Sequence, residues 1–221
     1  ISTFRDAGGL WDKYPVEQVA TPEGYARNPE LVINFYNERR KQLLDVVPNA
    51  GHLGVADLER DFNVTVVTQN VDNLHERAGS THVIHLHGEL TKVCSSRDPY
   101  NPHFVKELAP EEYEVKLGDK AGDGTQLRPF IVWFGESVPE IETAIRYVEQ
   151  ADIFVIIGTS LNVYPAAGLL NYVPRAAEVY LIDPKPVDTH VMRPIHVIQK
   201  GASEGVKELK ALLTVTQPPL P

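Results

Sequence analysis

Three histidines lie within six residues of one apolar run, THVIHLHGEL, which spans Thr81 to Leu90. Histidine can gain or lose a proton near neutral pH, and it is also a common metal ligand. The run therefore predicts a metal site, a catalytic base in a cleft, or a strand that carries structural histidines. In an extended strand His85 and His87 share one face and His82 takes the other, so one strand cannot present all three to one ligand.

A metal site is the weakest of these three interpretations. A two-histidine site remains open, but no cysteine or third ligand is visible nearby, and zinc sites ordinarily use three or four protein ligands. The chain has a single cysteine, Cys94, which excludes an internal disulfide and any all-cysteine metal site. The choice between base and structural residue depends on the elements around the run.

Five short apolar runs are bounded by turn residues, as is typical of buried strands in parallel sheets. They are NVTVVT, HVIHLH, PFIVWFG, DIFVIIGTS and EVYLIDP. Amphipathic helical patterns lie between several of them, including PELVINFYNERRKQLLDVV, PEIETAIRYVEQA and SEGVKELKALL. Strands that alternate with helices predict an α/β protein with a mainly parallel sheet.

Two stretches depart from this alternation. Residues 11–47 read as helical without a strand signal, and residues 94–126 are rich in proline, glycine and charge. We expect both to form a smaller helical and irregular module inserted into the sheet domain. The predicted sheet domain then consists of residues 1–10, 48–92 and 128–215, and the module of residues 11–47 and 93–127.

Polar residues follow all five apolar runs. Because ligands of open α/β sheets bind beyond the carboxyl ends of the strands, these residues predict a polar ligand crevice. Gly158 would let a backbone approach closely, and Thr159 and Ser160 could bond ribose hydroxyls or phosphate. An acid that ends a late strand, such as Asp183, is placed to hold a ribose diol. The agreement of five strand ends indicates more than any one of them.

The segments FRDAGGLW, TQNVDNLHERAG, HLHGEL, RPFIVWFGE and GTSLNVYPAAGL carry a resemblance that extends along nearly the whole chain. In this order they closely resemble the sirtuin family of NAD-dependent protein deacylases. The chain is most similar to the bacterial and mitochondrial branch that prefers acidic acyl groups. The resemblance implies a Rossmann-like parallel sheet domain with a smaller inserted module, and NAD as a co-substrate that the reaction consumes.

The resemblance also assigns roles residue by residue. His87 matches the catalytic histidine, which accepts a proton from a ribose hydroxyl once nicotinamide has left, whereas we expect structural roles for His82 and His85. The positions that match cofactor contacts are Phe4, Arg5, Gln69, Asn70, Asp72, Gly158, Thr159, Ser160, Asp183, Gly201 and Ala202. The positions that match the two segments pairing with the substrate peptide as an added strand are Val132, Phe134, Gly135, Glu136 and Val163.

Tyr36 and Arg39 lie three residues apart and so share one face of a predicted helix. Such a pair is usually a core tyrosine beside a solvated arginine. The resemblance implies instead the pocket of the branch that removes succinyl, malonyl or glutaryl groups. An arginine fork and a phenol can hold the distal carboxylate by charge-assisted hydrogen bonds of roughly 1.5–3 kcal/mol each. Ala20 is small enough to leave room for the longer chain.

We therefore expect NAD-dependent removal of acidic acyl groups from protein lysine, with some deacetylation, giving nicotinamide and O-acyl-ADP-ribose. Two alternatives stay open. A protein ADP-ribosyltransferase would use the same NAD site, and a non-catalytic reader would bind acyl-lysine or NAD without chemistry. The intact QNVD and HG segments argue against the reader, since a reader needs no base.

Two features depart from the family pattern. Most sirtuins hold a structural zinc with four cysteines, whereas this chain has only Cys94, so we expect no bound zinc and a module held by packing. The chain also begins at ISTFR, without the first strand and the glycine-rich loop that cradles the NAD pyrophosphate in the family. We expect that the gene encodes this first segment and that the segment is missing only from this sequence.

Composition sets the remaining expectations. Hydrophobic residues make up 43% of the 221 residues and charged residues 23%, as in ordinary globular proteins. A net charge of −9 argues against nucleic acid as a partner. No apolar run approaches the ~20 residues that span a bilayer. We expect a cytoplasmic monomer with acyl-lysine proteins or peptides as partners and neither nucleic acid nor membrane.

Overall fold

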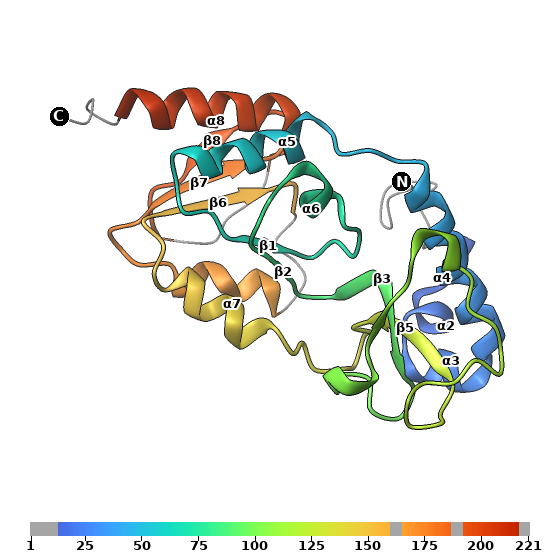
Figure 1. Cartoon of the computed structure of the whole chain (residues 1–221). Helices are drawn as coiled ribbons and strands as arrows, with labels where there is room; N and C mark the ends of the chain where they lie inside the picture. Colours follow the sequence, from blue (N-terminus) through green and yellow to red (C-terminus); the bar gives the residue numbers. More distant parts are fainter. Residues whose placement is uncertain (1–12, 160–164, 187–191, 217–221) are drawn as a thin grey trace. The chain divides into compact units, whose positions relative to one another are not determined.

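The computed structural model describes residues 13–159, 165–186 and 192–216, and these form two compact units (Figure 1). Unit 1 combines the described residues up to Val46 with Gln69–Asn73 and His85–Pro139. Unit 2 combines Val47–Thr68 and Leu74–Ile84 with the described residues from Glu140 onwards. The chain therefore passes between the units several times, and each unit is built from segments far apart in the sequence.

In the described part of unit 1 three helices come first, which confirms the helical interpretation of this stretch. They are α2 (Val16–Val19), α3 (Pro22–Arg27) and α4 (Pro29–Leu44). Both α3 and α4 begin with a proline directly after a side-chain cap. Thr21 Oγ accepts from Gly24 N at 3.0 Å, and Asn28 Oδ1 accepts from Leu31 N at 3.1 Å. This is a favoured helix start, because the cap satisfies a free N–H and proline needs none.

Helix α4 is anchored by buried polar side chains as well as by apolar packing. The Asn37 side-chain amide donates to Val115 O at 2.8 Å and accepts from Val115 N at 2.9 Å, as a strand neighbour would. Arg40 donates to Tyr113 O at 2.7 Å and to Leu90 O at 3.4 Å, and burial lowers its pKa to about 10. These bonds fix the rotation of α4 about its axis.

The sheet of unit 1 is antiparallel, in the order β4–β3–β5. Its strands are β3 (Gly88–Ser95), β4 (Lys106–Glu107) and β5 (Leu127–Ile131), with short 3-10 helices η2 (Pro102–Phe104) and η3 (Pro110–Glu112) in the excursion between β3 and β5. The predicted parallel strand at PFIVWFG is wrong, since β5 pairs antiparallel with β3 and ends at Ile131. A short buried run has the same pattern in both kinds of sheet.

Unit 2 contains a three-stranded parallel sheet in the order β6–β7–β8. Strands β6 (Ile153–Ile157) and β7 (Glu178–Ile182) confirm two predicted parallel strands, while β8 (His196–Ile198) was not predicted. The other strands are β1 (Val66–Thr68) and β2 (Val83–His85), which pair with each other. The predicted strand HVIHLH thus ends at His85, and a turn follows it.

Helices border this sheet and complete the core of unit 2. They are α5 (Ala50–Asp57), η1 (Leu58–Arg60), α6 (Leu74–Ala78), α7 (Ile141–Val148), η4 (Ala166–Tyr172) and α8 (Ala202–Thr216). Figure 1 shows α8 and α5 alongside β7 and β8. The core draws on these elements through Val55, Leu58, Tyr180, Ile182, Ile198, Val206, Leu209 and Leu213. A Cβ at Gly205 would lie 2.2 Å from Ile182 Cγ2, so α8 packs closely on β7.

The predicted α/β fold, with a parallel sheet and helices, is confirmed. Unit 1 also contains an antiparallel sheet, which the predicted helical and irregular module did not include. The predicted domain boundaries stay a prediction. Unit 1 includes residues 69–73, 85–92 and 128–139, which the prediction gave to the sheet domain. Among the described helices, none is long and apolar enough to span a membrane.

Candidate active site

His87 lies in the turn between β2 and β3, and its ring has a defined orientation. Its Nδ1 is 3.2 Å from the carbonyl oxygen of Gln69. A carbonyl oxygen can only accept, so Nδ1 carries the proton and donates. In the neutral ring Nε2 then holds the lone pair, which is the arrangement that a general base requires.

Backbone hydrogen bonds join the segment Gln69–Asp72 to β3, and join the turn at His87 to the segment after β5. Leu90 N donates to Val71 O at 2.7 Å, and Val132 N donates to His87 O at 2.9 Å. Three predicted site segments, at 69–72, 87 and 132, therefore meet in unit 1. Gln69 and Asp72 are partly buried and Asn70 is exposed.

Gly88 is required next to His87 for two independent reasons. Its φ of +85° lies in the region that favours glycine, and a Cβ there would lie 2.1 Å from Phe130 O. The backbone of β5 thus passes directly against the turn. This close approach sets the position from which the His87 ring projects.

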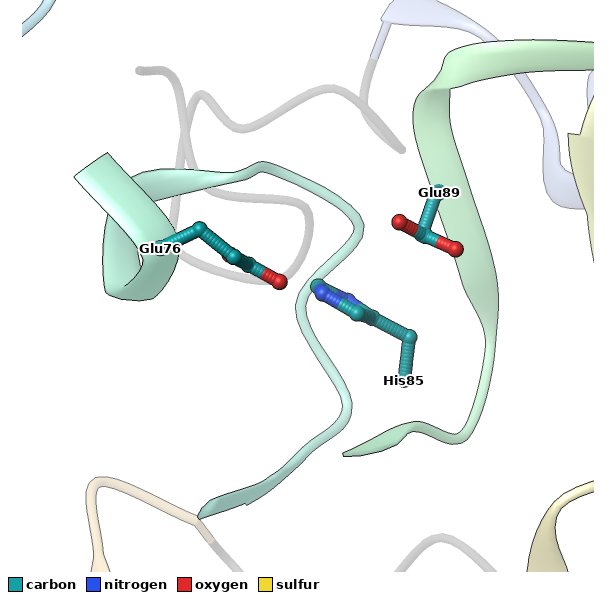
Figure 2. Close-up of side chains that lie close together, drawn as sticks. All are labelled: Glu76, His85 and Glu89. Atoms are coloured by element: carbon teal, nitrogen blue, oxygen red, sulfur yellow. The ribbon is translucent and has the colours of Figure 1, made fainter. Parts of the chain in front are cut away.

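His85 and His82 have local partners that fit structural roles. His85 Nδ1 donates to Asn70 O at 3.2 Å. His85 ends β2 and Glu89 lies on β3, and their ligand atoms lie within 4.8 Å of each other. Figure 2 shows these two side chains; Glu76, also drawn, belongs to α6 of unit 2. Among its described residues unit 1 alone offers no group of three metal-ligating side chains. His82 Nδ1 is 2.9 Å from Thr65 Oγ1.

The predicted acyl-binding residues all belong to unit 1, and both polar members are buried. Tyr36 is 3% exposed and Arg39 is 7% exposed. Arg39 Nη2 is 3.6 Å from Glu38, and its guanidinium carbon lies 4.9 Å from the centre of the Phe35 ring. Its Nε and Nη1 are buried without a hydrogen-bond partner among the described residues. Arg39 is therefore a buried cation, and two of its donor nitrogens have no partner in the described part of the chain.

The predicted peptide-binding segment follows β5 and is tightly fixed. Phe134 N donates to Ala20 O at 3.0 Å, which ties the segment to the buried Ala20. Glu136 N donates to Trp133 O at 3.0 Å, so the segment forms a turn. The Phe134 side chain is 48% exposed, and Gly135 is exposed with a φ of +90°. The N–H groups at positions 132, 134 and 136 already donate within unit 1.

The Glu136 carboxylate has several partners within unit 1. It accepts from Arg128 Nη1 at 2.7 Å, from Arg128 Nη2 at 3.1 Å and from Tyr100 Oη at 2.9 Å. It also accepts from Trp133 N at 2.8 Å. Burial alone would raise the pKa of Glu136, but the bonds and charge of Arg128 outweigh burial and lower it. The carboxylate therefore braces the turn in its ionised form.

Trp133 binds a predicted site residue, Tyr36, and the sequence patterns do not predict this contact. Trp133 is 2% exposed, and its Nε1 donates to the Tyr36 hydroxyl at 3.1 Å across 97 residues of sequence. The Arg128 guanidinium carbon lies 3.6 Å from the centre of its ring. One sequence signal could have pointed to Trp133. Two residues of opposite charge, Arg128 and Glu136, lie eight residues apart on either side of the WFG segment.

In unit 2 the predicted cofactor residues follow the carboxyl ends of the parallel strands. Gly158 and Thr159 follow β6, Asp183 follows β7, and Gly201 follows β8 just before Ala202 opens α8. Gly158 has a φ of +60°, and a Cβ placed on it would have nothing within 4 Å, which leaves space for a close ligand. Asp183 Oδ1 accepts from Lys185 N at 2.8 Å. Four further predicted residues, Phe4, Arg5, Ser160 and Val163, lie outside the described residues.

The sequence and these features match one family. The family model described as the Sir2 family matches residues 1–165, so the chain belongs to the Sir2 family. An NAD-dependent protein deacylase of Bacteroides thetaiotaomicron is 84% identical over 213 residues, which cover 96% of this chain and 91% of that protein. One of Helicobacter pylori is 47% identical over 209 residues, 95% of this chain and 89% of that protein.

Solved structures agree with this assignment. A Sir2 homologue in complex with NAD has a TM-score of 0.81 and 36% identity, covering 97% of this chain and 84% of that one. The sirtuin resemblance and the Rossmann-like fold are thereby confirmed.

The residues around Cys94 do not fit the structural zinc of the family pattern. Cys94 is fully buried, its Sγ lies 3.7 Å from Pro129 O, and burial raises its pKa to about 12. The four-cysteine zinc site of the family pattern needs three further thiolates, which a chain with a single cysteine cannot supply. Hydrogen bonds connect the adjacent end of β3 to the loop that precedes β5. Ser95 Oγ donates to Asp123 Oδ2 at 2.7 Å, and Thr125 Oγ1 donates to Asp123 Oδ1 at 2.7 Å.

Proposed function

We propose that this Sir2-family chain is an NAD-dependent protein-lysine deacylase that prefers acidic acyl groups such as succinyl and malonyl and retains some deacetylation. Nicotinamide and O-acyl-ADP-ribose would be the products. The observation that carries the acyl preference is the buried Arg39 guanidinium, with two donors that have no partner among the described residues. Relatives named NAD-dependent protein deacylases support the reaction class.

A buried charge is costly unless it is paired. Arg39 is 7% exposed, while the Glu38 side chain beside it is 66% exposed and 3.6 Å away, so this ion pair is weak. A distal carboxylate on the acyl group would complete the pairing with two parallel N–H bonds. An acetyl group has no such oxygens and would leave the guanidinium as it is.

His87 would supply the proton transfer. NAD, when bound, would supply the ribose carbon at which the chemistry occurs: nicotinamide departs from this carbon, and the carbonyl oxygen of the acyl group attacks it. The His87 ring, held by Gln69 O through Nδ1–H, would accept a ribose hydroxyl proton at Nε2. The backbone at Gly158 and the carboxylate of Asp183 would contact the cofactor in unit 2, and acylated lysine peptides would be the partners.

The test compares two matched peptides. Full-length protein is incubated with NAD and with succinyl-lysine and acetyl-lysine peptides of one sequence, and both are followed by mass spectrometry. Arg39→Met should lower kcat/KM for the succinyl peptide about 10- to 150-fold, the equivalent of one charge-assisted hydrogen bond, and spare the acetyl peptide. Arg27→Met, at an exposed arginine of α3, is the matched control and should change neither.

Equal rates on both peptides in the unaltered protein would contradict the acidic preference. NAD consumption with intact peptides and labelled protein would indicate an ADP-ribosyltransferase instead. NAD binding without any turnover would indicate a reader. His87→Ala should abolish turnover of both peptides if the deacylase proposal holds.

A further inference from the structure

We propose that Trp133 is a positioning residue of the acyl pocket, which directs the hydroxyl hydrogen of Tyr36 towards the carboxylate of an acidic acyl group. The inference rests on the proposed function, because it concerns the same pocket. It adds a residue that does not itself contact the acyl group. Its basis is one buried hydrogen bond between two side chains and the network that holds one of them.

The bond has only one possible direction. Trp133 Nε1 lies 3.1 Å from the Tyr36 hydroxyl oxygen, and an indole nitrogen can only donate. The Tyr36 oxygen therefore accepts, and the tyrosine keeps its own hydrogen for another partner. Among the described residues the structure gives this hydrogen no acceptor. Burial raises the pKa of Tyr36, so the hydroxyl stays protonated and remains a donor at cellular pH.

The indole that makes this bond is held in place from several sides. The Arg128 guanidinium carbon lies 3.6 Å from the ring centre, and the Tyr25 ring centre is 5.3 Å away. The Trp133 backbone N donates to Glu136, which also binds both terminal nitrogens of Arg128. Because ring face and backbone are tied to one ion pair, Nε1 has little freedom to turn from Tyr36.

The same network connects the peptide segment to the acyl pocket. Glu136 closes the turn after β5, and Trp133 lies inside that turn. Tyr36 and Arg39 share one face of α4. A purely structural tryptophan would support both substrates equally, whereas a positioning residue should matter only for an acyl group that uses the tyrosine hydrogen. This difference can be measured.

The experiment is a double-mutant cycle in KM. Trp133→Phe removes the N–H donor and keeps an aromatic ring. We expect KM for the succinyl-lysine peptide to rise about 2- to 12-fold, as for one neutral hydrogen bond, with kcat and the acetyl-lysine KM within twofold. In a Tyr36→Phe background, Trp133→Phe should add no further change. Tyr147→Phe, at an exposed tyrosine of α7 in unit 2, is the matched control and should alter neither KM.

Several results would overturn the inference. Equal losses on both peptides would show a structural role, and additive effects of the two substitutions would show that Trp133 does not act through Tyr36. A succinyl preference that survives Trp133→Phe unchanged would refute this inference alone, whereas no preference in the unaltered protein would refute the proposed function with it. If Trp133→Phe does not fold, replacing the indole of Trp133 by benzothiophene removes the N–H and keeps the shape; the same KM pattern is expected.

Discussion

Removal of the Glu136 carboxylate should destabilise the protein more than the substitution of any one solvent-exposed side chain. In Glu136→Ala the Arg128 guanidinium loses two bonds of 2.7 and 3.1 Å, while its side chain is only 4% exposed. The hydroxyl of Tyr100 and the backbone N–H of Trp133 lose their acceptor as well. Breaking a buried ion pair from one side costs about 3–5 kcal/mol, because the remaining charge is uncompensated.

Urea denaturation followed by tryptophan fluorescence measures this cost, since the buried Trp133 contributes to the signal. At about 2–4 °C per kcal/mol for a chain of this size, Tm should fall by roughly 6–20 °C. The double variant Arg128→Met with Glu136→Leu removes both charges and should be more stable than Glu136→Ala alone.

A loss below about 1 kcal/mol in Glu136→Ala would refute the reasoning, because it would mean that the pair is solvated and not buried. The reasoning would also be refuted if the double variant lost as much stability as Arg128→Met and Glu136→Leu lose together as single variants. The two charges would then be independent.

Three further outcomes are expected. Gly88→Ala should prevent folding or lower the free energy of unfolding by several kcal/mol, since φ is +85° and Phe130 O would lie 2.1 Å from the added Cβ. Circular dichroism and urea titration would check this, and a stable, active variant would contradict it. Hydrogen bonds from Ser95 and Thr125 lower the pKa of Asp123 from 3.8 to about 2, so its stabilisation is present above pH about 4 and lost as pH falls towards 2. Asp123→Asn should therefore flatten the fall of Tm in that window, and an unchanged acid limb would argue against it. EDTA should leave Tm and deacylation unchanged, and stoichiometric zinc in the purified protein by mass spectrometry would refute the expected absence.

The strands at β6 and β7 could be predicted because runs of five and four consecutive apolar residues, each followed by turn residues, leave few other structures. Strand β8 could not, since HVI is too short to stand out. The direction of β5 was also beyond the sequence, because pairing direction depends on a partner strand and leaves no trace in a short buried run. The split of HVIHLH at His85 depends on the positive φ of Gly88.

The candidate site was predictable where a motif carries it. His87 and the Gln69–Asp72 segment stand in long motifs. The structure brings them together through the bond from the His87 ring to Gln69 O and the backbone bond from Leu90 N to Val71 O. The burial of Arg39 and the bond between Trp133 and Tyr36 were not predictable, since both depend on residues that become neighbours only in the folded chain. The role of Glu136 as a brace was likewise hidden by its place in a substrate motif.

The wide sequence separation within unit 1 has a consequence for biosynthesis. The anchors of α4 lie far downstream, with Val115 separated from Asn37 by 78 residues and Trp133 from Tyr36 by 97. At about 5–20 residues per second, the ribosome delivers Trp133 roughly 5–20 s after Tyr36. During that interval the apolar face of α4 and its two arginines lack their final neighbours. We therefore expect α4 to complete its packing only after the chain has been synthesised as far as Trp133.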